Sequence, residues 1–162
     1  MTIRSLTETD ELWESVADFA ERCSWKAGKS LAKQMRSRSF QEWERVFVAV
    51  GQTAAAPDGT PVTIAGYCTF AKTDCLPDLP YSPYIGYVFV AEPFRGQQLS
   101  ERLIHACLQY ARQLGYEKVY LISDHVNLYE KYGFVKIDEK PVFLIQVDVV
   151  ADQVDHVNLY EK

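Results

Sequence analysis

The residues with the clearest capacity for chemistry lie at a strand-to-helix turn around Arg95. The run Tyr84–Val90, YIGYVFV, is aromatic and β-branched, which predicts a buried strand that Pro93 should end. Apolar residues then recur every three or four positions from Leu99 to Leu114, which predicts a helix. A helix that starts directly after a strand exposes unpaired N–H groups and the positive end of its dipole. With the Arg95 cation, these groups predict a binding site for an anion of phosphate size.

A second strand-and-turn segment follows at once. Lys118–Ile122, KVYLI, predicts another buried strand. Ser123 or Asp124 can cap a short helix, which we expect to run through Tyr132 and to end at Gly133.

Together the two segments resemble the GNAT superfamily of acetyltransferases. Leu128–Phe134, LYEKYGF, resembles the family's LYEKxGF signature. Arg95–Ser100, RGQQLS, resembles its pyrophosphate loop, Gln/Arg-x-x-Gly-x-Gly/Ala, with Gln98 and Ser100 where the family usually has Gly and Gly/Ala. The resemblance is clear over residues 67–147 and rests on general pattern alone over the first sixty residues.

The resemblance implies an N-acetyltransferase. Such an enzyme moves the acetyl group of acetyl-CoA to a primary amine of a small molecule or peptide, by direct transfer with no covalent enzyme intermediate. The pantetheine chain would add like a strand beside Phe89 and Val90, whose N–H groups can also face the thioester oxygen. Asn127 is a further candidate to contact it. The pyrophosphate would be bound by Arg95, Gly96, Gln97, Gln98, Leu99 and Ser100.

Two residues are expected to act in catalysis. By the resemblance, Tyr129 lies beside the CoA sulfur, where its phenol can donate a hydrogen bond to the leaving thiolate. The acceptor amine must lose a proton before attack, and Glu92, just past a strand end, is the nearest carboxylate in sequence. Asp124 and His125 flank the next strand end, although a helix cap and a surface position are their alternative roles. A relay through water is a further alternative.

The acceptor site is expected to be aromatic and acidic. By the resemblance, the two N-terminal helices wall the acceptor pocket, which makes Trp25 and Met35 candidate lining residues. Carboxylates and aromatic rings suit a cationic amine, whereas the alternative is a tyrosine-rich core beside a solvated loop. The residues concerned are Trp25, Tyr67, Tyr81, Tyr84, Tyr87, Asp74 and Asp78.

The elements that must position these residues follow from the pattern of the whole chain. Their order, β-α-α-β-β-β-α-β-α-β, predicts an α/β (α+β) fold. We expect a mixed, mostly antiparallel central sheet of six to seven strands flanked by about four helices. The remaining expected elements are strands at Thr2–Leu6, Arg45–Val50, Val62–Ala71 and Val142–Val147, helices at Leu12–Cys23 and Ser30–Arg38, and a hairpin turn at Gly51–Pro61.

Composition excludes several classes of protein. A chain of 162 residues with 48% hydrophobic and 24% charged residues suits one globular domain. The net charge of −5 argues against nucleic acid or an anionic membrane as a partner. The four cysteines are irregularly spaced and the three histidines form no metal pattern. We therefore expect free thiols, no bound metal and a cytoplasmic location.

The end of the chain repeats an internal segment. Residues 155–162, DHVNLYEK, are identical to residues 124–131. We interpret residues 1–150 as the acetyltransferase domain and residues 151–162 as a frayed tail left by a duplication. The sharper hypothesis is that the tail replaces residues 124–131 in a neighbouring molecule, which would make a homodimer.

Two other functions compete with the enzyme. A non-catalytic acyl-CoA binder would keep the cleft without turning over an amine. A mononucleotide-binding protein would use the Arg95 loop for another phosphate, but the chain has no Gly-x-Gly-x-x-Gly or Walker pattern.

Overall fold

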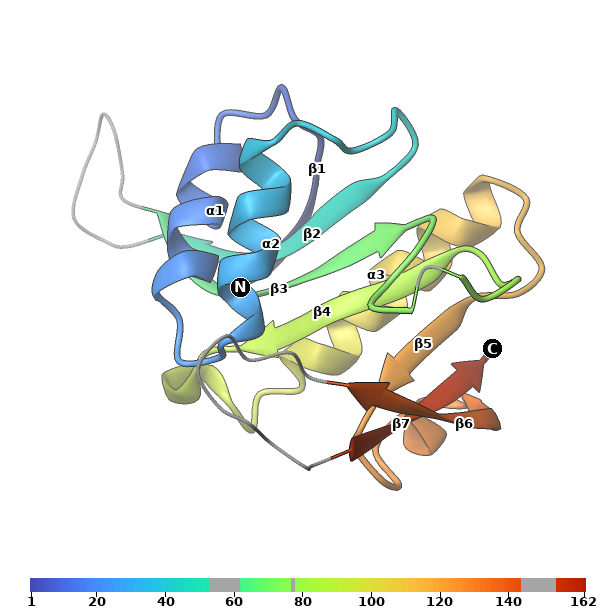
Figure 1. Ribbon diagram of the computed structural model, residues 1–162. Helices are drawn as coiled ribbons and strands as arrows, with labels where there is room; N and C mark the ends of the chain where they lie inside the picture. The colour runs from blue at the N-terminus through green and yellow to red at the C-terminus, as the bar shows by residue number, and fades with distance from the viewer. Residues whose placement is uncertain (53–61, 77, 144–153) are drawn as a thin grey trace.

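The computed structural model describes residues 1–52, 62–76, 78–143 and 154–162. Within them, seven strands form one sheet in the order β1-β2-β3-β4-β5-β7-β6 (Figure 1). Every neighbouring pair is antiparallel except β4 and β5, which confirms the predicted fold class. The strands are β1 Thr2–Leu6, β2 Arg45–Gln52, β3 Val62–Ala71, β4 Tyr84–Val90, β5 Tyr120–Ser123, β6 Val135–Phe143 and β7 Val154–Glu161. The helices are α1 Trp13–Arg22, α2 Ala27–Arg36 and α3 Leu99–Gln113, with 3-10 turns η1 Glu92–Phe94 and η2 Tyr129–Tyr132.

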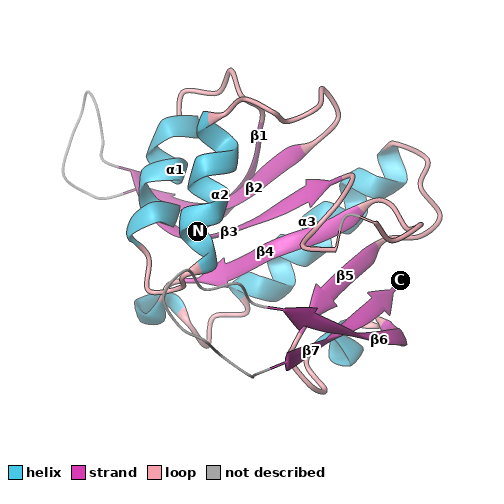
Figure 2. Ribbon diagram, viewed as in Figure 1, coloured by secondary structure: helices cyan, strands magenta, loops and turns pink. Residues whose placement is uncertain are grey.

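The helices cover both faces of the sheet (Figure 2). Helices α1 and α2 lie over one face and α3 over the other. Strand β2 contributes side chains to the core on both faces of the sheet. Val46 and Val48 pack under α1 and α2, whereas Phe47 and Ala49 pack under α3. Burial on both faces explains why this strand is a continuous apolar run rather than an alternating one.

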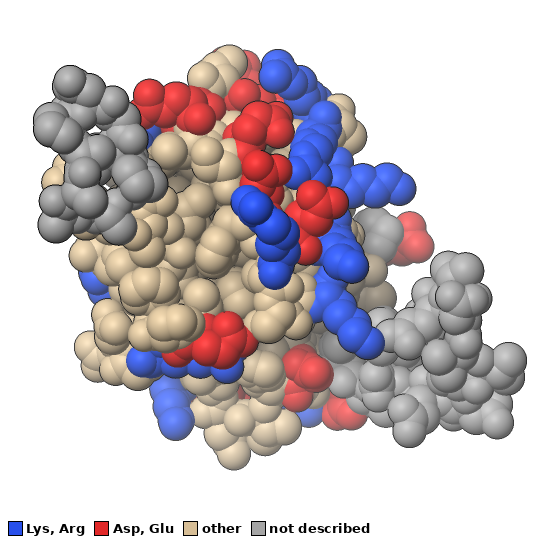
Figure 3. All heavy atoms as spheres, turned by 90° about the vertical axis from the view of Figure 1, so that its left-hand side faces the viewer, with Lys and Arg blue, Asp and Glu red and all other residues tan. Residues whose placement is uncertain are grey.

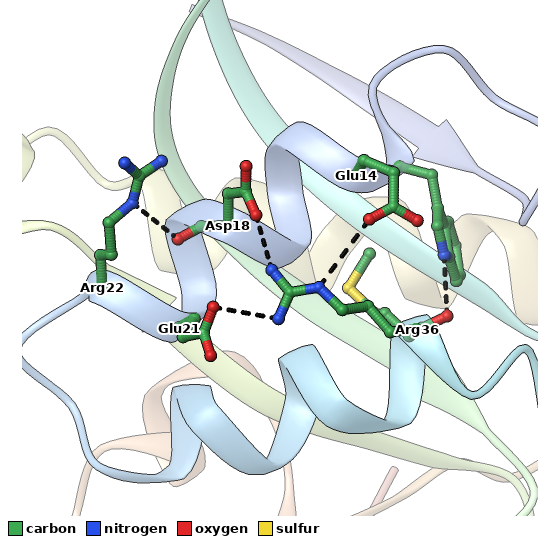
Figure 4. Close-up of polar contacts among 7 residues, drawn as sticks. Glu14, Asp18, Glu21, Arg22 and Arg36 are labelled. Atoms are coloured by element: carbon green, nitrogen blue, oxygen red, sulfur yellow. Dashed lines mark hydrogen bonds and ion pairs between the residues drawn. The ribbon is translucent and has the colours of Figure 1, made fainter.

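Helices α1 and α2 are joined by packing and by charge. The Trp13 indole donates a hydrogen bond to the Met35 carbonyl at 3.0 Å, and both side chains are buried. Above them Arg36 reaches across to α1 (Figure 4), where it pairs with Asp18 (2.6 Å), Glu21 (3.0 Å) and Glu14 (3.8 Å). Figure 3 shows acidic and basic side chains side by side on this part of the surface. The Arg36 cation therefore links α2 to α1 through ion pairs.

Strands β4 and β5 pair over only two residues before they separate. The parallel register joins Tyr84 to Tyr120 and Ile85 to Leu121. Immediately afterwards Tyr87 has a φ of +49°, and the β3–β4 register shifts there, as a β-bulge requires. The bulge turns the end of β4 away from β5. The backbone of Val88–Val90 is therefore not paired with β5 and borders a gap in the sheet.

The two largest differences from the predicted elements lie at residues 123–132 and at the end of the chain. The short helix expected to run from Ser123 or Asp124 to Tyr132 contains only the 3-10 turn η2, so the described residues hold three α-helices. Gly133 ends this turn at φ +85°, as predicted. The last predicted strand, Val142–Val147, begins earlier and belongs to β6; its residues 144–147 lie outside the described residues, as do residues 53–61 of the predicted hairpin turn.

The second difference concerns the expected tail. Val154–Glu161, placed outside the domain by the sequence analysis, forms β7 and lies between β5 and β6 in the sheet. It pairs antiparallel with both neighbours, for example Leu121 with Tyr160 and Lys136 with Tyr160. Leu159 and Tyr160 are fully buried there. The physical reason is that β5 and β6 offer two open edges, which one further strand satisfies.

Candidate active site

A cleft of about 860 Å³ opens where β4 and β5 separate. Its floor is the end of β4, one wall is β5 with the turn that follows, and the start of α3 closes one end. Eight of the predicted site residues line it: Phe89, Val90, Arg95, Gly96, Gln98, Leu99, Ser100 and Tyr129. Glu92, Gln97 and Asn127 are not among its lining residues.

The loop that enters α3 is shaped by two left-handed residues. Gly96 has φ +78°, and Gln98, the N-cap of α3, has φ +57° and ψ +23°. A left-handed conformation is strained for any residue with a Cβ, so Gln98 holds a backbone shape for which glycine is better suited. This shape lets the loop turn directly into the first turn of α3, whose N–H groups have no partner within the helix and whose residues Leu99 and Ser100 line the cleft. The arrangement is that of an anion site.

Arg95 lies at the mouth of this loop. Its Nε donates to the Val90 carbonyl at 3.1 Å, and its Nη2 pairs with Glu92 at 3.2 Å. More than half of the Arg95 side chain is exposed, so the guanidinium keeps donors free for a ligand. The Val90 bond ties the cation to the end of β4.

Glu92 is engaged by its neighbours. Its carboxylate accepts hydrogen bonds from the Ser24 hydroxyl and from Arg95. These bonds, the Ser24 bond first, lower the pKa of Glu92, which makes it a weaker proton acceptor. The geometry does not favour Glu92 as the base, and its role stays a prediction.

Tyr129 lies on the opposite wall of the cleft. Its ring is buried and packs against Tyr160 at 5.6 Å and Phe134 at 6.3 Å between ring centroids. Burial raises the pKa of Tyr129 to about 12, although a hydrogen bond with Ser123 opposes this shift. At neutral pH the phenol is therefore protonated and can act as a hydrogen-bond donor into the cleft.

The same wall contains residues that the sequence analysis treated as alternatives. Asp124 and His125 both line the cleft, and the His125 Nδ1 lies 3.1 Å from the Asp124 Oδ1. Both side chains are well exposed. The His125 ring stacks near Tyr129, with ring centroids 6.4 Å apart.

Aromatic residues surround the end of the cleft nearest α2. Trp25 stacks on Phe89 with ring planes 7° apart and centroids 6.1 Å apart, and it meets Tyr87 edge to face. The Tyr87 hydroxyl lies 3.1 Å from the Ser30 hydroxyl of α2. Trp25 lines the cleft and is 38% exposed, so part of its side chain is accessible to a ligand.

Four other predicted acceptor residues are not among those that line the cleft. Met35 and Tyr67 are fully buried in the core beneath α1 and α2, and burial raises the pKa of Tyr67. Tyr81 and Tyr84 pack on Tyr120.

Some residues that line the cleft were missed by the sequence analysis. Ser24, Cys75, Gly86 and Ser123 are examples. Ser24 and Cys75 reach the cleft only through the tertiary fold and gave no local signal. Gly86 did give a local signal, because a glycine inside a strand often marks a place where a ligand or another part of the chain approaches the backbone closely.

The described part of the chain contains neither a membrane-spanning helix nor a metal-binding cluster. No described helix is long and apolar enough to cross a membrane. No cluster of three or more histidine, cysteine, aspartate or glutamate residues suited to a metal ion occurs there.

Comparisons with known proteins agree with this geometry. A model of the Acetyltransferase (GNAT) family matches residues 11–134. An aminoglycoside 6'-N-acetyltransferase complexed with coenzyme A is 14% identical with a TM-score of 0.65, over 100% of this chain and 96% of that one. A spermidine N-acetyltransferase chimera from Vibrio cholerae and hSSAT is 16% identical with a TM-score of 0.61, over 99% and 93%. The protein yncA of Salmonella typhimurium, with its cofactor acetyl-CoA, is 17% identical with a TM-score of 0.62, over 100% and 92%. No curated protein matches.

Proposed function

Because the chain belongs to the GNAT acetyltransferase family, we propose that it transfers the acetyl group of acetyl-CoA directly to a primary amine. The observation that carries the proposal is the cleft between β4 and β5, which has an anion site at one end and a buried phenol on its wall. Solved relatives of this fold include proteins described with coenzyme A or acetyl-CoA.

The residues of the cleft suit the separate parts of acetyl-CoA. The pyrophosphate would bind the free N–H groups of the loop Arg95–Ser100 and the Arg95 guanidinium. The pantetheine amides would pair with the backbone of β4 at Phe89 and Val90, where β5 no longer does. Bound in this way, acetyl-CoA would complete the gap in the sheet.

The reaction requires charge to be stabilised at two atoms. A backbone N–H at the end of β4 can donate to the thioester oxygen as negative charge develops during attack. Tyr129 can donate to the sulfur as the C–S bond breaks. Since the Tyr129 pKa of about 12 is above that of a thiol, near 8.5, we expect hydrogen bonding in preference to full proton transfer before product release.

The acceptor is proposed to be a small cationic amine. The partly exposed Trp25 side chain beside Tyr87 offers an aromatic surface for a cation at the end of the cleft. Among the solved relatives, one is named for an aminoglycoside and one for spermidine, both of which carry several amines. A peptide amine is the second candidate and uses the same chemistry.

The first test is ligand binding. In a thermal-shift titration, acetyl-CoA and CoA should each raise the Tm by several degrees at a hundredfold excess over Kd, while NAD and ATP should not. Arg95→Ala should weaken acetyl-CoA binding about tenfold to hundredfold. Arg112→Ala is the matched control, because Arg112 is exposed in the last turn of α3. No shift with either CoA species would refute the proposal.

The second test is turnover. Release of CoA thiol from acetyl-CoA is measured with spermidine, an aminoglycoside and a short peptide. Amine-dependent release supports the enzyme. Binding of acetyl-CoA with no release for any amine would favour the acyl-CoA binder instead.

A further inference from the structure

A carboxylate that follows β3 lies against one residue of the cleft floor. Asp74 lies on the loop that joins β3 to β4, and its carboxylate rests against Gly86 of β4, which lines the cleft. A Cβ at residue 86 would lie only 3.2 Å from both Cγ and Oδ2 of Asp74, and 3.0 Å from the Thr69 hydroxyl. The missing side chain of Gly86 thus provides the space that Asp74 occupies.

The surroundings of Asp74 suit a ligand with hydrogen-bond donors. The Asp74 Oδ1 accepts the Cys75 N–H at 2.8 Å, and no other hydrogen bond or ion pair to this carboxylate occurs in the described residues. The Tyr84 hydroxyl, close enough to interact electrostatically with Asp74, is buried without a hydrogen-bond partner in the described part of the chain. A buried polar group without a partner calls for an explanation, and a functional role is one of those that proteins show.

We propose that the Asp74 carboxylate binds the acceptor ammonium and accepts the proton that it loses before attack. This inference rests on the proposed acetyl transfer. The proton moves from the ammonium nitrogen to an Asp74 oxygen, and the freed lone pair forms the new bond to the thioester carbon. The C–S bond then breaks with its electron pair on sulfur, and Tyr129 stabilises the thiolate by hydrogen bonding. The nitrogen, which is cationic after the attack, gives its second proton to this thiolate. The products are the N-acetyl amine and CoA, with one proton released to solvent from Asp74.

The charges around Asp74 agree with this role. Burial raises the pKa of Asp74 to about 6, so the group is ionised at neutral pH yet binds a proton more readily than an exposed aspartate. The titratable groups that face it are Cys75 on its own loop and Tyr84 and Tyr87 on β4. The pKa of each is raised, to about 11 for Cys75 and about 12 for Tyr84, so all three are neutral at pH 7. Glu92, in contrast, has a lowered pKa and two partners.

The test compares Asp74 with an exposed carboxylate elsewhere in the chain. Asp74→Asn keeps the shape of the side chain, and we expect it to lower kcat/KM for the amine by about a hundredfold or more. Wild-type kcat/KM should fall below about pH 6, and this acidic limb should be absent in Asp74→Asn. Glu117→Gln is the comparison variant, because the exposed Glu117 carboxylate, between α3 and β5, belongs neither to the cleft lining nor to the contact with Gly86. It should keep both the rate and the acidic limb.

Two more variants separate catalysis from folding. Asp74→Glu, which retains a carboxylate, should recover part of the lost kcat/KM. Gly86→Ala should lower kcat/KM because its Cβ displaces the carboxylate, while the thermal shift with acetyl-CoA should be kept. An active wild type with equal kcat/KM and an unchanged acidic limb in Asp74→Asn overturns the inference. A loss of rate in Asp74→Asn that Asp74→Glu does not relieve, with the acidic limb retained, overturns it as well. A wild type that acetylates no amine refutes the proposed function instead.

Discussion

The two copies of the octapeptide DHVNLYEK have the same letters and different structures. Residues 124–131 form a bend and most of the 3-10 turn η2 beside the cleft, whereas residues 155–161 lie in strand β7, between β5 and β6 in the sheet. Asn127 has a left-handed backbone, with φ +60°, whereas Asn158 is extended and buried. Local preference is therefore too weak to set either conformation, and the neighbours of each copy decide.

The contexts of the two copies explain the difference. The first copy is followed by Gly133, whose positive φ closes the turn, and it packs between the cleft and β7. The second copy meets two open strand edges, β5 and β6, and a strand is the conformation that pairs with both. The copies also contact each other, because the Tyr160 hydroxyl donates to the His125 carbonyl at 2.9 Å. The second copy thus supports the segment that carries Tyr129.

Removing the second copy should have the largest effect. Deletion of residues 151–162 takes away β7, including fully buried Leu159 and Tyr160, each worth about 1.5 to 3 kcal/mol of burial. Together with the lost ladder hydrogen bonds, we expect the Tm to fall by about 10 °C or more. Calorimetry measures this. An unchanged Tm would show that β7 is dispensable, and size-exclusion chromatography of the same variant tests the predicted homodimer.

The tyrosines of the two copies should differ in function. Tyr129→Phe retains the ring contacts but removes the donor beside the cleft, so we expect kcat to fall about tenfold to hundredfold. The Tm should stay within a few degrees of the wild type. Thiol-release kinetics measure the rate. Full activity in this variant would exclude Tyr129 as the donor to the sulfur.

The turn that ends the first copy can be tested at one residue. Gly133→Ala places a Cβ on a backbone with φ +85°, and that Cβ would lie 2.9 Å from the Lys162 Nζ. We expect a loss of about 1 to 2 kcal/mol in the free energy of unfolding, mainly from the backbone strain. Urea denaturation measures the loss. Gly115→Ala, at φ +84° with nothing near its Cβ, is the matched control for the backbone term alone.

The smallest effect is expected at the contact between the copies. Tyr160→Phe removes the hydroxyl that donates to the His125 carbonyl and should lower the free energy of unfolding by about 1 kcal/mol. The kcat should remain close to that of the wild type, in contrast to Tyr129→Phe. If both variants lost activity equally, the two tyrosines would act as one packed unit, and the functional distinction between the copies would be lost.

Much of the fold could be predicted because its signals are local. The apolar spacing from Leu99 to Leu114 predicted α3 to within one residue, and the run Tyr84–Val90 coincides with β4. Gly115 and Gly133 both have the positive φ expected of residues that end a helix or turn. Such features depend on residues within one or two turns of one another, which a single sequence contains in full.

The candidate site was predicted only where its residues adjoin such local signals. The loop Arg95–Ser100 and Tyr129 were named from motifs, and most of these residues line the cleft. The bond from Ser24 to Glu92 joins residues 68 positions apart, and the contact of Asp74 with Gly86 depends on how a loop folds over β4. No spacing rule gives contacts of that kind.

The sequence of this protein therefore determined its family resemblance, its strand-to-helix turn and most of its elements, because these features depend on residues that are close together in the sequence. The conformation of the repeated octapeptide, the separation of β4 from β5 and the place of Asp74 were decided by the tertiary structure. Each of them depends on which edges, faces and cavities the rest of the chain leaves open. Those are set by long-range packing, which outweighs the small local preferences of any eight residues.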